Sequence, residues 1–157
     1  MRLISHRGNL NGPNESCEND PKYIDEAIDL GFDVEIDIWL VDNKYIFLGH
    51  DAPKYPVPYM WLEQREKSLW MHCKNADSFE FLHRLEYVQH NYFWHQTDQY
   101  TLTSRGYIWA YPTAVPIAGA IIAIPESAYG REWIQKMLEK GFIGGICSDY
   151  ISQYRVS

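Results

Sequence analysis

The sequence predicts an α/β protein with a mainly parallel sheet. Short aliphatic or aromatic runs alternate along the chain with segments whose apolar residues recur at helical spacing, which favours parallel strands joined by helices. The chain has 157 residues, of which 46% are hydrophobic, and this is ample for one core. Because it contains no repeat, low-complexity tract or linker, we expect residues 1–157 to form a single domain.

The first helix has recognisable ends. A short strand at Leu3–His6 is followed by a polar loop at Asn9–Asn14, which we expect to be mobile. Asp20 suits the N-cap of a helix, and Pro21 suits its first position, where no backbone N–H is needed. Gly31 is expected to end this helix.

A strand, a hairpin arm and a loop come next. Asp33–Trp39 is predicted to be a strand because its apolar and acidic residues alternate. Tyr45–Leu48 follows a polar turn and is expected to fold back as a hairpin arm. The segment Ala52–Pro58 holds three prolines and is predicted to be a loop.

The second half continues the alternation of strands and helices. The predicted strands are Leu69–Lys74, Tyr92–His95, Tyr107–Tyr111, Ala120–Ile124 and Ile143–Cys147, and the predicted helices are Ser78–Val88 and Gly130–Lys140. The stretch from His95 to Pro125 has room for strands but little room for helices.

Two carboxylates lie on one face of the predicted strand at Asp33–Trp39. Side chains alternate across a strand, so Glu35 and Asp37 point to one side while Ile36 points to the other. Paired carboxylates repel each other unless a positive charge lies between them, and a hard divalent cation is the usual partner. The alternative is a pair of surface carboxylates on an edge strand.

Histidines flank this strand in the sequence. His6-Arg7-Gly8 ends the first apolar run, and His50-Asp51 follows the hairpin arm. A histidine at a strand end, a strand with paired carboxylates and a second histidine together indicate a metal-assisted site for phosphate chemistry.

The order and spacing of these motifs resemble the glycerophosphodiester phosphodiesterase family, part of the phospholipase-C-like phosphodiesterase superfamily. The family pattern of His-Arg-Gly, Glu-Asn, Glu-x-Asp and His-Asp is met by His6-Arg7-Gly8, Glu18-Asn19, Glu35-Ile36-Asp37 and His50-Asp51. The separation between Glu35 and His50 also matches. Beyond Asp51 the resemblance is weaker, although Cys147-Ser148-Asp149 looks like the end of the family's closing strand.

The resemblance implies a TIM-type (β/α) barrel, a fold that usually takes about 250 residues. A chain of 157 residues is too short for eight full units. We therefore expect a trimmed barrel with seven or eight mainly parallel strands and some outer helices missing. The bare outer surface needs a cover, either the tryptophans and tyrosines between Tyr87 and Tyr111 or a second subunit, so a homo-oligomer is one expectation.

The resemblance also implies one divalent metal ion, Mg or Ca, bound by Glu35 and Asp37. The family's third ligand comes from a Glu-x-Lys strand that reads His72-Cys73-Lys74 here, so His72 takes the place of the glutamate. Imidazole is neutral and softer than carboxylate, which would shift the preference toward Mn or Zn, or leave metal binding weak or lost. Glu18 is a candidate fourth carboxylate or, alternatively, a residue of the helix entry.

Four further roles follow from the resemblance. Arg7 and Lys74 would bind phosphate oxygens, and Arg7 alternatively forms a salt bridge with an inward carboxylate. His6 and His50 would be the catalytic acid–base pair, without an assignment of which is the acid. The attacking oxygen would be water, giving hydrolysis, or a neighbouring substrate hydroxyl, giving a cyclic phosphate.

The sequence predicts less specific roles for four other residues. His95 belongs either to the pocket or to an aromatic core, and His83 and His90 are expected to be solvated. Asp149 is expected either to hold a cationic side chain or to form a turn or cap.

Together these features predict a metal-dependent phosphoric diester hydrolase that acts on a small glycerophosphodiester-like or sugar-phosphate-linked substrate. One alternative is a catalytically degenerate member of the family that binds a phosphorylated ligand. Another is a metal-dependent hydrolase of a non-phosphate bond, although a neutral substrate would give Arg7 and Lys74 no partner.

Composition excludes other classes. The net charge of −7 argues against a nucleic-acid binder. No apolar run approaches the roughly 20 residues that span a membrane, and the first motif begins at once, without a signal peptide. Three cysteines without a pairing pattern indicate reduced thiols and a cytoplasmic location.

Overall fold

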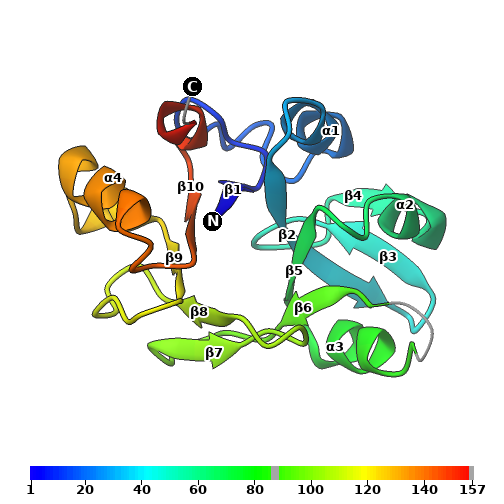
Figure 1. Ribbon diagram of the computed structural model, residues 1–157. Helices are drawn as coiled ribbons and strands as arrows, with labels where there is room; N and C mark the ends of the chain where they lie inside the picture. Colours follow the sequence, from blue (N-terminus) through cyan, green and yellow to red (C-terminus); the bar gives the residue numbers. More distant parts are fainter. Residues whose placement is uncertain (86–88, 156–157) are drawn as a thin grey trace.

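The computed structural model describes residues 1–85 and 89–155 (Figure 1). Within these residues the strands are β1 (Arg2–His6), β2 (Asp33–Val41), β3 (Tyr45–Leu48), β4 (Tyr55–Val57), β5 (Leu69–Cys73), β6 (Asn91–Phe93), β7 (Tyr100–Leu102), β8 (Ile108–Ala110), β9 (Ile121–Ala123) and β10 (Gly145–Ser148). The helices are α1 (Pro21–Asp29), α2 (Tyr59–Gln64), α3 (Ala76–His83) and α4 (Arg131–Glu139), with short 3-10 turns η1 (Pro125–Ser127) and η2 (Ile151–Tyr154). All of these strands belong to one sheet.

Seven of the strands form a parallel wall in the order β6-β5-β2-β1-β10-β9-β8. β7 pairs antiparallel with β8, and the same stretch of chain bonds to the backbone around β6. There the Ser104 N–H donates to the Tyr92 carbonyl at 2.8 Å, and Thr101 Oγ1 donates to the Trp94 carbonyl at 3.1 Å. Figure 1 shows the resulting ring of strands. The fold is a trimmed TIM-type barrel, which confirms the predicted fold class.

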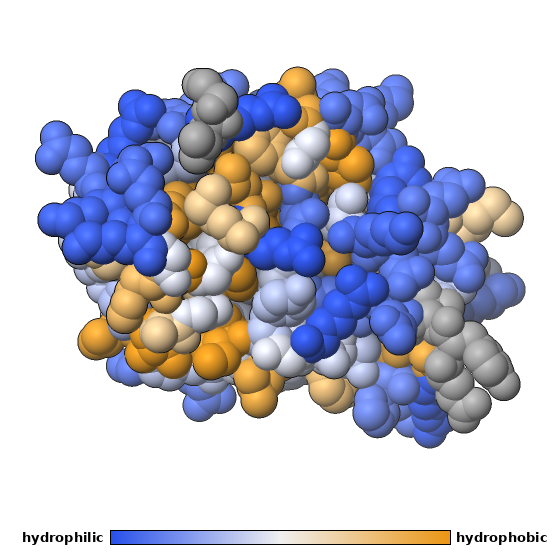
Figure 2. All heavy atoms as spheres, in the orientation of Figure 1, coloured by the Kyte–Doolittle hydropathy of each residue, from blue (hydrophilic) through white to orange (hydrophobic). Residues whose placement is uncertain are grey.

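The outer helical layer is incomplete, as expected. The helices lie outside the ring in Figure 1, but the chain from β6 to β9 contains none. In the view of Figure 2, apolar residues gather at the lower left of the molecule. Leu102 in β7 and Val115 before β9 leave 66% and 68% of their surfaces exposed. Homo-oligomerisation stays a prediction.

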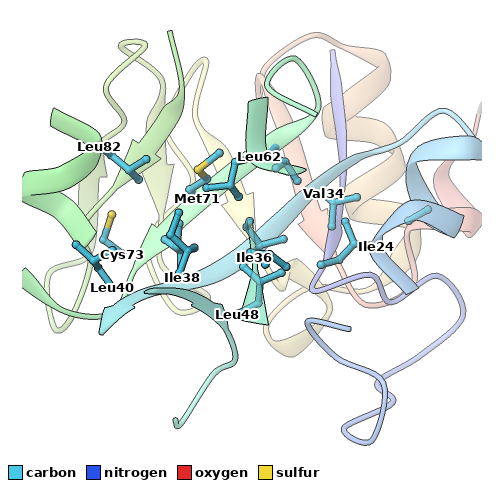
Figure 3. Packing of buried hydrophobic residues seen from close by; sticks show 14 residues of the cluster. Ile24, Val34, Ile36, Ile38, Leu40, Leu48, Leu62, Met71, Cys73 and Leu82 are labelled. Atoms are coloured by element: carbon cyan, nitrogen blue, oxygen red, sulfur yellow. The ribbon is translucent and has the colours of Figure 1, made fainter. Parts of the chain in front are cut away.

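The residues of β2 alternate between two environments. Val34, Ile36 and Ile38 are at most 1% exposed and belong to a cluster that includes side chains of α1, α2 and α3 (Figure 3). Full burial of such a side chain contributes about 1.5–3 kcal/mol. The opposite face of β2 therefore carries Glu35 and Asp37 into the barrel, where they are 3% and 0% exposed.

Large aromatic rings also fill the barrel interior. Trp109 lies with its ring centroid 4.6 Å from that of Phe93 and 5.9 Å from that of Trp70. Short strands offer few inward positions, so each must carry a large side chain to fill the space. The expectation that aromatic residues between Tyr87 and Tyr111 cover the outside is wrong for Trp109, and Tyr87 lies outside the described residues.

The strand β4, the helix α2 and the strand β7 were not expected. β4 lies within the segment predicted to be a loop, and its Pro56 is tolerated because β4 is an edge strand paired only with β3. α3 begins at Ala76, before the expected Ser78, because the Asn75 side chain accepts the Ser78 N–H and caps the helix. The predicted end of that helix at Val88 lies outside the described residues.

We predict that Trp70→Ala lowers the free energy of unfolding by about 3–5 kcal/mol, because it empties the centre of the barrel. Trp70 is 2% exposed, whereas Tyr45 is 51% exposed on the hairpin and serves as the control. Tyr45→Ala should change stability by no more than about 0.5 kcal/mol. Urea unfolding measures both. A loss below about 1 kcal/mol for Trp70→Ala would mean that the interior is not packed as described.

Candidate active site

The candidate site lies at the carboxyl ends of β1, β2 and β5. His6 is the last residue of β1 and pairs in register with Glu35 of β2. Asp37, two residues further along β2, pairs in register with His72 of β5. Lys74 follows the end of β5. The parallel register thus brings residues from three separate parts of the sequence to one end of the barrel.

Glu35, Asp37 and His72 each offer a ligand atom, and these atoms lie within 4.8 Å of one another. His72 Nδ1 is 3.2 Å from Asp37 Oδ1 and 3.9 Å from Glu35 Oε1. His72 Nε2 is 2.9 Å from the carbonyl oxygen of His95, which can only accept, so Nε2 is the donor. In the neutral ring, Nδ1 then turns a lone pair toward the carboxylates.

Two buried carboxylate oxygens in this group lack hydrogen-bond partners. They are Glu35 Oε2 and Asp37 Oδ1. Buried polar atoms are rarely left unpaired, and here Asp37 Oδ1 faces His72 Nδ1, while Glu35 Oε2 faces His6 Nε2. Two carboxylates and one imidazole suit a divalent cation, so the residues present fit the metal that the sequence implies.

The two carboxylates differ in their electrostatics. Burial raises the pKa of Glu35, and the charge of Asp37 raises it further. Burial would also raise the pKa of Asp37, but the nearby charges of Arg7 and Lys74 hold that pKa below its usual range. Asp37 is therefore the firmly ionised member of the pair.

Arg7 and Lys74 surround Asp37 with positive charge. Arg7 Nε lies 2.9 Å from Asp37 Oδ2, and Lys74 Nζ lies 3.3 Å from Asp37 Oδ1. Arg7 Nη1 also donates to Glu18 Oε2 at 3.0 Å. The salt bridge considered for Arg7 is thus present, and Glu18 pairs with Arg7 instead of joining the metal-binding group.

Asn19 orients Asp37 by two hydrogen bonds. Its Nδ2 donates to Asp37 Oδ2 at 2.9 Å, and its Oδ1 accepts the Asp37 N–H at 2.9 Å. Asn19 adopts a left-handed backbone with φ of 63°, a conformation that asparagine tolerates. The Glu-Asn motif was the only signal for this residue in the sequence, and it did not reveal the contact.

The loop after β1 holds its shape through a close contact and a buried side chain. Gly8 has φ of 94°, and a Cβ there would lie 2.6 Å from the ring of Tyr23, so glycine is required. Asn9 is fully buried, and its Nδ2 donates to Glu18 Oε1 and Asp149 Oδ1, both at 2.8 Å. The expectation of a mobile loop is therefore wrong at Asn9.

His6 is held by Asp149 from the end of β10. His6 Nδ1 donates to Asp149 Oδ1 at 2.7 Å, while Nε2 lies 3.9 Å from Glu35 Oε2. Burial lowers the pKa of His6, but the Asp149 hydrogen bond and the Glu35 charge outweigh it, so the pKa is raised. Asp149 thus holds a cationic side chain, one of its two expected roles.

The hairpin brings His50 to the same end of the barrel. Because β1 ends at His6, the edge of β2 beyond Glu35 is free, and β3 pairs there with Ile38–Val41. Gly49 then turns the chain with φ of 148°, where a Cβ would lie 2.2 Å from a backbone oxygen. Burial and the charge of Arg7 lower the pKa of His50.

Two cavities of the site share part of their lining. The larger measures about 660 Å³ and the smaller about 180 Å³. His6, Arg7 and His50 line both. A group bound between these residues can therefore extend one arm into each cavity.

The remaining histidines have mixed outcomes. His95 lines the smaller cavity, with its ring stacked on Tyr111 at a centroid distance of 5.0 Å. His83 is exposed as expected. His90 is only 2% exposed and contacts the Tyr59 hydroxyl at 3.2 Å, so the expectation that it is solvated is wrong.

Known proteins provide a structural likeness and no sequence likeness. No protein-family profile matches the sequence, and no curated protein is significantly similar to it. The chain is similar to the crystal structure of a glycerophosphodiester phosphodiesterase from Parabacteroides distasonis, with a TM-score of 0.51, 8% identity, and coverage of 98% of this chain and 94% of that one. It also matches a glycerophosphodiester phosphodiesterase from Thermotoga maritima, with a TM-score of 0.48, 11% identity, and coverage of 98% and 97%. The chain has a fold like that of the glycerophosphodiester phosphodiesterases.

Proposed function

We propose that this chain is a metal-dependent phosphoric diester hydrolase for a small glycerophosphodiester-like or sugar-phosphate-linked substrate. The observation that carries the proposal is the buried group Glu35, Asp37 and His72, in which the Asp37 carboxylate lies beside Arg7 and Lys74. The fold shared with a glycerophosphodiester phosphodiesterase supports it. A non-phosphate substrate would leave the two cationic side chains without a ligand.

Glu35, Asp37 and His72 would hold one divalent cation. Such an ion supplies Lewis-acid charge to the phosphoryl oxygens. Because one ligand is a nitrogen, we expect Mn or Zn to be preferred over the Mg or Ca that a third carboxylate would favour. Arg7 and Lys74 would bind the phosphodiester oxygens and offset the negative charge that develops on them.

The opposite pKa shifts of the two histidines suggest their roles. The raised pKa of His6 favours its protonated form, so we assign it as the general acid that protonates the leaving alcohol from Nε2. The lowered pKa of His50 keeps it neutral, so we assign it as the base. His50 would take the proton from water in hydrolysis, or from a neighbouring substrate hydroxyl in cyclisation.

A second candidate function is binding of a phosphorylated ligand without turnover. It is favoured by His72, which replaces the family's glutamate, and by the trimmed barrel. The same cationic residues would then hold the phosphate, but no metal-dependent hydrolysis would be seen.

Domain organisation and location stay predictions. A single domain over residues 1–157 and a cytoplasmic location rest on the sequence; Cys17, Cys73 and Cys147 are all free thiols. Among the described residues no helix is long and apolar enough to cross a membrane.

The first test is hydrolysis of bis(p-nitrophenyl) phosphate by metal-stripped protein, with Mg, Ca, Mn or Zn added back. We expect Mn or Zn to restore turnover, and Glu35→Gln to lower it more than about 100-fold, because loss of even an outer-shell partner of a metal costs about 10–100-fold. Glu132→Gln on α4, which removes an exposed carboxylate, is the matched control. Folded protein that hydrolyses neither this diester nor the smaller methyl p-nitrophenyl phosphate with any ion would favour the ligand-binding alternative.

The second test is the pH profile of kcat/KM. His50 must lose its proton, so its lowered pKa moves the acidic limb below the ordinary histidine value of about 6.5. His6 must keep its proton, so its raised pKa moves the alkaline limb above that value. Asp149→Asn removes the charge that holds the proton on His6, and the alkaline limb should move to lower pH.

Asp51→Asn is the control for this profile, because Asp51 contacts His50 at 2.7 Å and is largely exposed. It should leave the alkaline limb in place. An alkaline limb unaffected by Asp149→Asn would contradict the assignment of His6 as the acid.

The third test restores the family's ligand with His72→Glu. Three carboxylates suit hard cations, so we expect the preferred ion to change from Mn or Zn toward Mg or Ca. The half-maximal metal concentration for activity measures the preference. His83→Glu, on an exposed face of α3, adds the same charge elsewhere as a control. An unchanged order of ions would argue that His72 is not a ligand.

A further inference from the structure

The two cavities that meet at His6, Arg7 and His50 have linings of different chemistry. The larger includes the exposed charged residues Glu15 and Lys54. The smaller is lined by Glu35 and His72 of the metal-binding group and also by aromatic and aliphatic side chains. If a phosphodiester binds between them, as the proposed function requires, its two alcohol arms enter different environments. The inference below rests on that proposed function.

Part of the wall of the smaller cavity is apolar. Its walls include the stacked rings of His95 and Tyr111, together with Phe93, Trp109 and Ile124. A water molecule occupies about 30 Å³ in the liquid, so a volume of about 180 Å³ corresponds to about six non-hydrogen atoms. Flat rings and aliphatic groups offer contact to the C–H surface of a small arm.

Ile124 lines this cavity in an unusual backbone conformation. Its φ of 44° and ψ of 54° lie in the left-handed region, which β-branched residues rarely adopt. The Ile124 N–H donates to the Cys147 carbonyl at 2.7 Å, and its carbonyl accepts from Ser127 Oγ at 2.8 Å, so the turn is fixed on both sides. Glycine or asparagine would adopt this turn with less strain.

We infer that Ile124 is a specificity-determining residue that limits the smaller cavity to one short alcohol arm, while the larger cavity takes the more polar arm. Strained residues persist where the surrounding structure holds them, and they concentrate at functional sites. Here the strained residue is half-buried, lines a cavity shared with His6, Arg7 and His50, and adds bulk to it. Removing that bulk should admit a larger arm without altering the metal-binding group.

The test compares methyl p-nitrophenyl phosphate with bis(p-nitrophenyl) phosphate in metal-loaded protein. The leaving group is the same, and only the second arm grows. Ile124→Gly should raise the ratio of kcat/KM for the bulky over the methyl diester at least tenfold, and Ile124→Val should give an intermediate ratio. Ile117→Gly, which removes an equal side chain outside both cavities, should leave the ratio within twofold of the wild-type value. An unchanged ratio in Ile124→Gly overturns the inference.

Calorimetric titration separates this inference from the proposed function. The dissociation constants of both diesters are measured in proteins that also carry His50→Ala, or in otherwise unmodified proteins if neither diester is hydrolysed. If neither diester is hydrolysed but Ile124→Gly still changes the ratio of their dissociation constants, only the catalytic proposal is refuted. Binding of neither diester would overturn both. The melting temperature of Ile124→Gly should not fall below that of Ile117→Gly, and a larger fall would assign Ile124 to packing instead.

Discussion

The buried carboxylate of Asp37 is the group on which the arrangement of the site depends. A charge that is 0% exposed costs several kcal/mol unless it is paired and hydrogen-bonded. Its partners come from two segments: Arg7 and Asn19 from the chain between β1 and α1, and His72 and Lys74 from β5 and its end. The left-handed turns at Arg7 and Asn19 are both held by this requirement, since each side chain must reach the same carboxylate. The charge thus fixes the positions of Arg7 and Lys74, the proposed phosphate-binding residues, before any ligand is present.

Outer helices are missing only beside the chain from β6 to β9, away from Asp37 and His72. The barrel can therefore be trimmed without loss of the candidate site. The candidate metal-binding residues lie on β2 and β5, whose outer faces pack against α1, α2 and α3 (Figure 3). The bare strands β7 and β8 lie elsewhere in the ring and contribute Trp109 to the aromatic interior and to the wall of the smaller cavity (Figure 1). Packing on the inside therefore replaces part of the stabilisation that helices provide on the outside of a full barrel.

The sequence was most informative where a local pattern determines the structure. The alternation of β2 predicted which residues face inward, and the pattern of the hairpin arm predicted how His50 arrives. β4 was missed because a segment with three prolines is expected to be a loop unless it is known to lie at the edge of a sheet. The contact between Asp149 and His6 joins residues 143 positions apart, and the buried Asn9 donates to the same Asp149 oxygen, so neither contact could be found from local sequence. The strain at Ile124 has no sequence signal, because only the fold imposes a left-handed turn there.

Charge balance gives a physical reason why metal and substrate would bind together. Glu18, Glu35 and Asp37 contribute three negative charges when ionised, against two positive charges from Arg7 and Lys74. The raised pKa of Glu35 reflects this excess, since burial and a neighbouring carboxylate both disfavour its ionised form. A divalent cation would reverse the net charge to positive, and a phosphodiester, with one negative charge, would bring it to zero. A third carboxylate at position 72 would remove that balance, so the histidine there suits a site that must be neutral only when both ligands are bound.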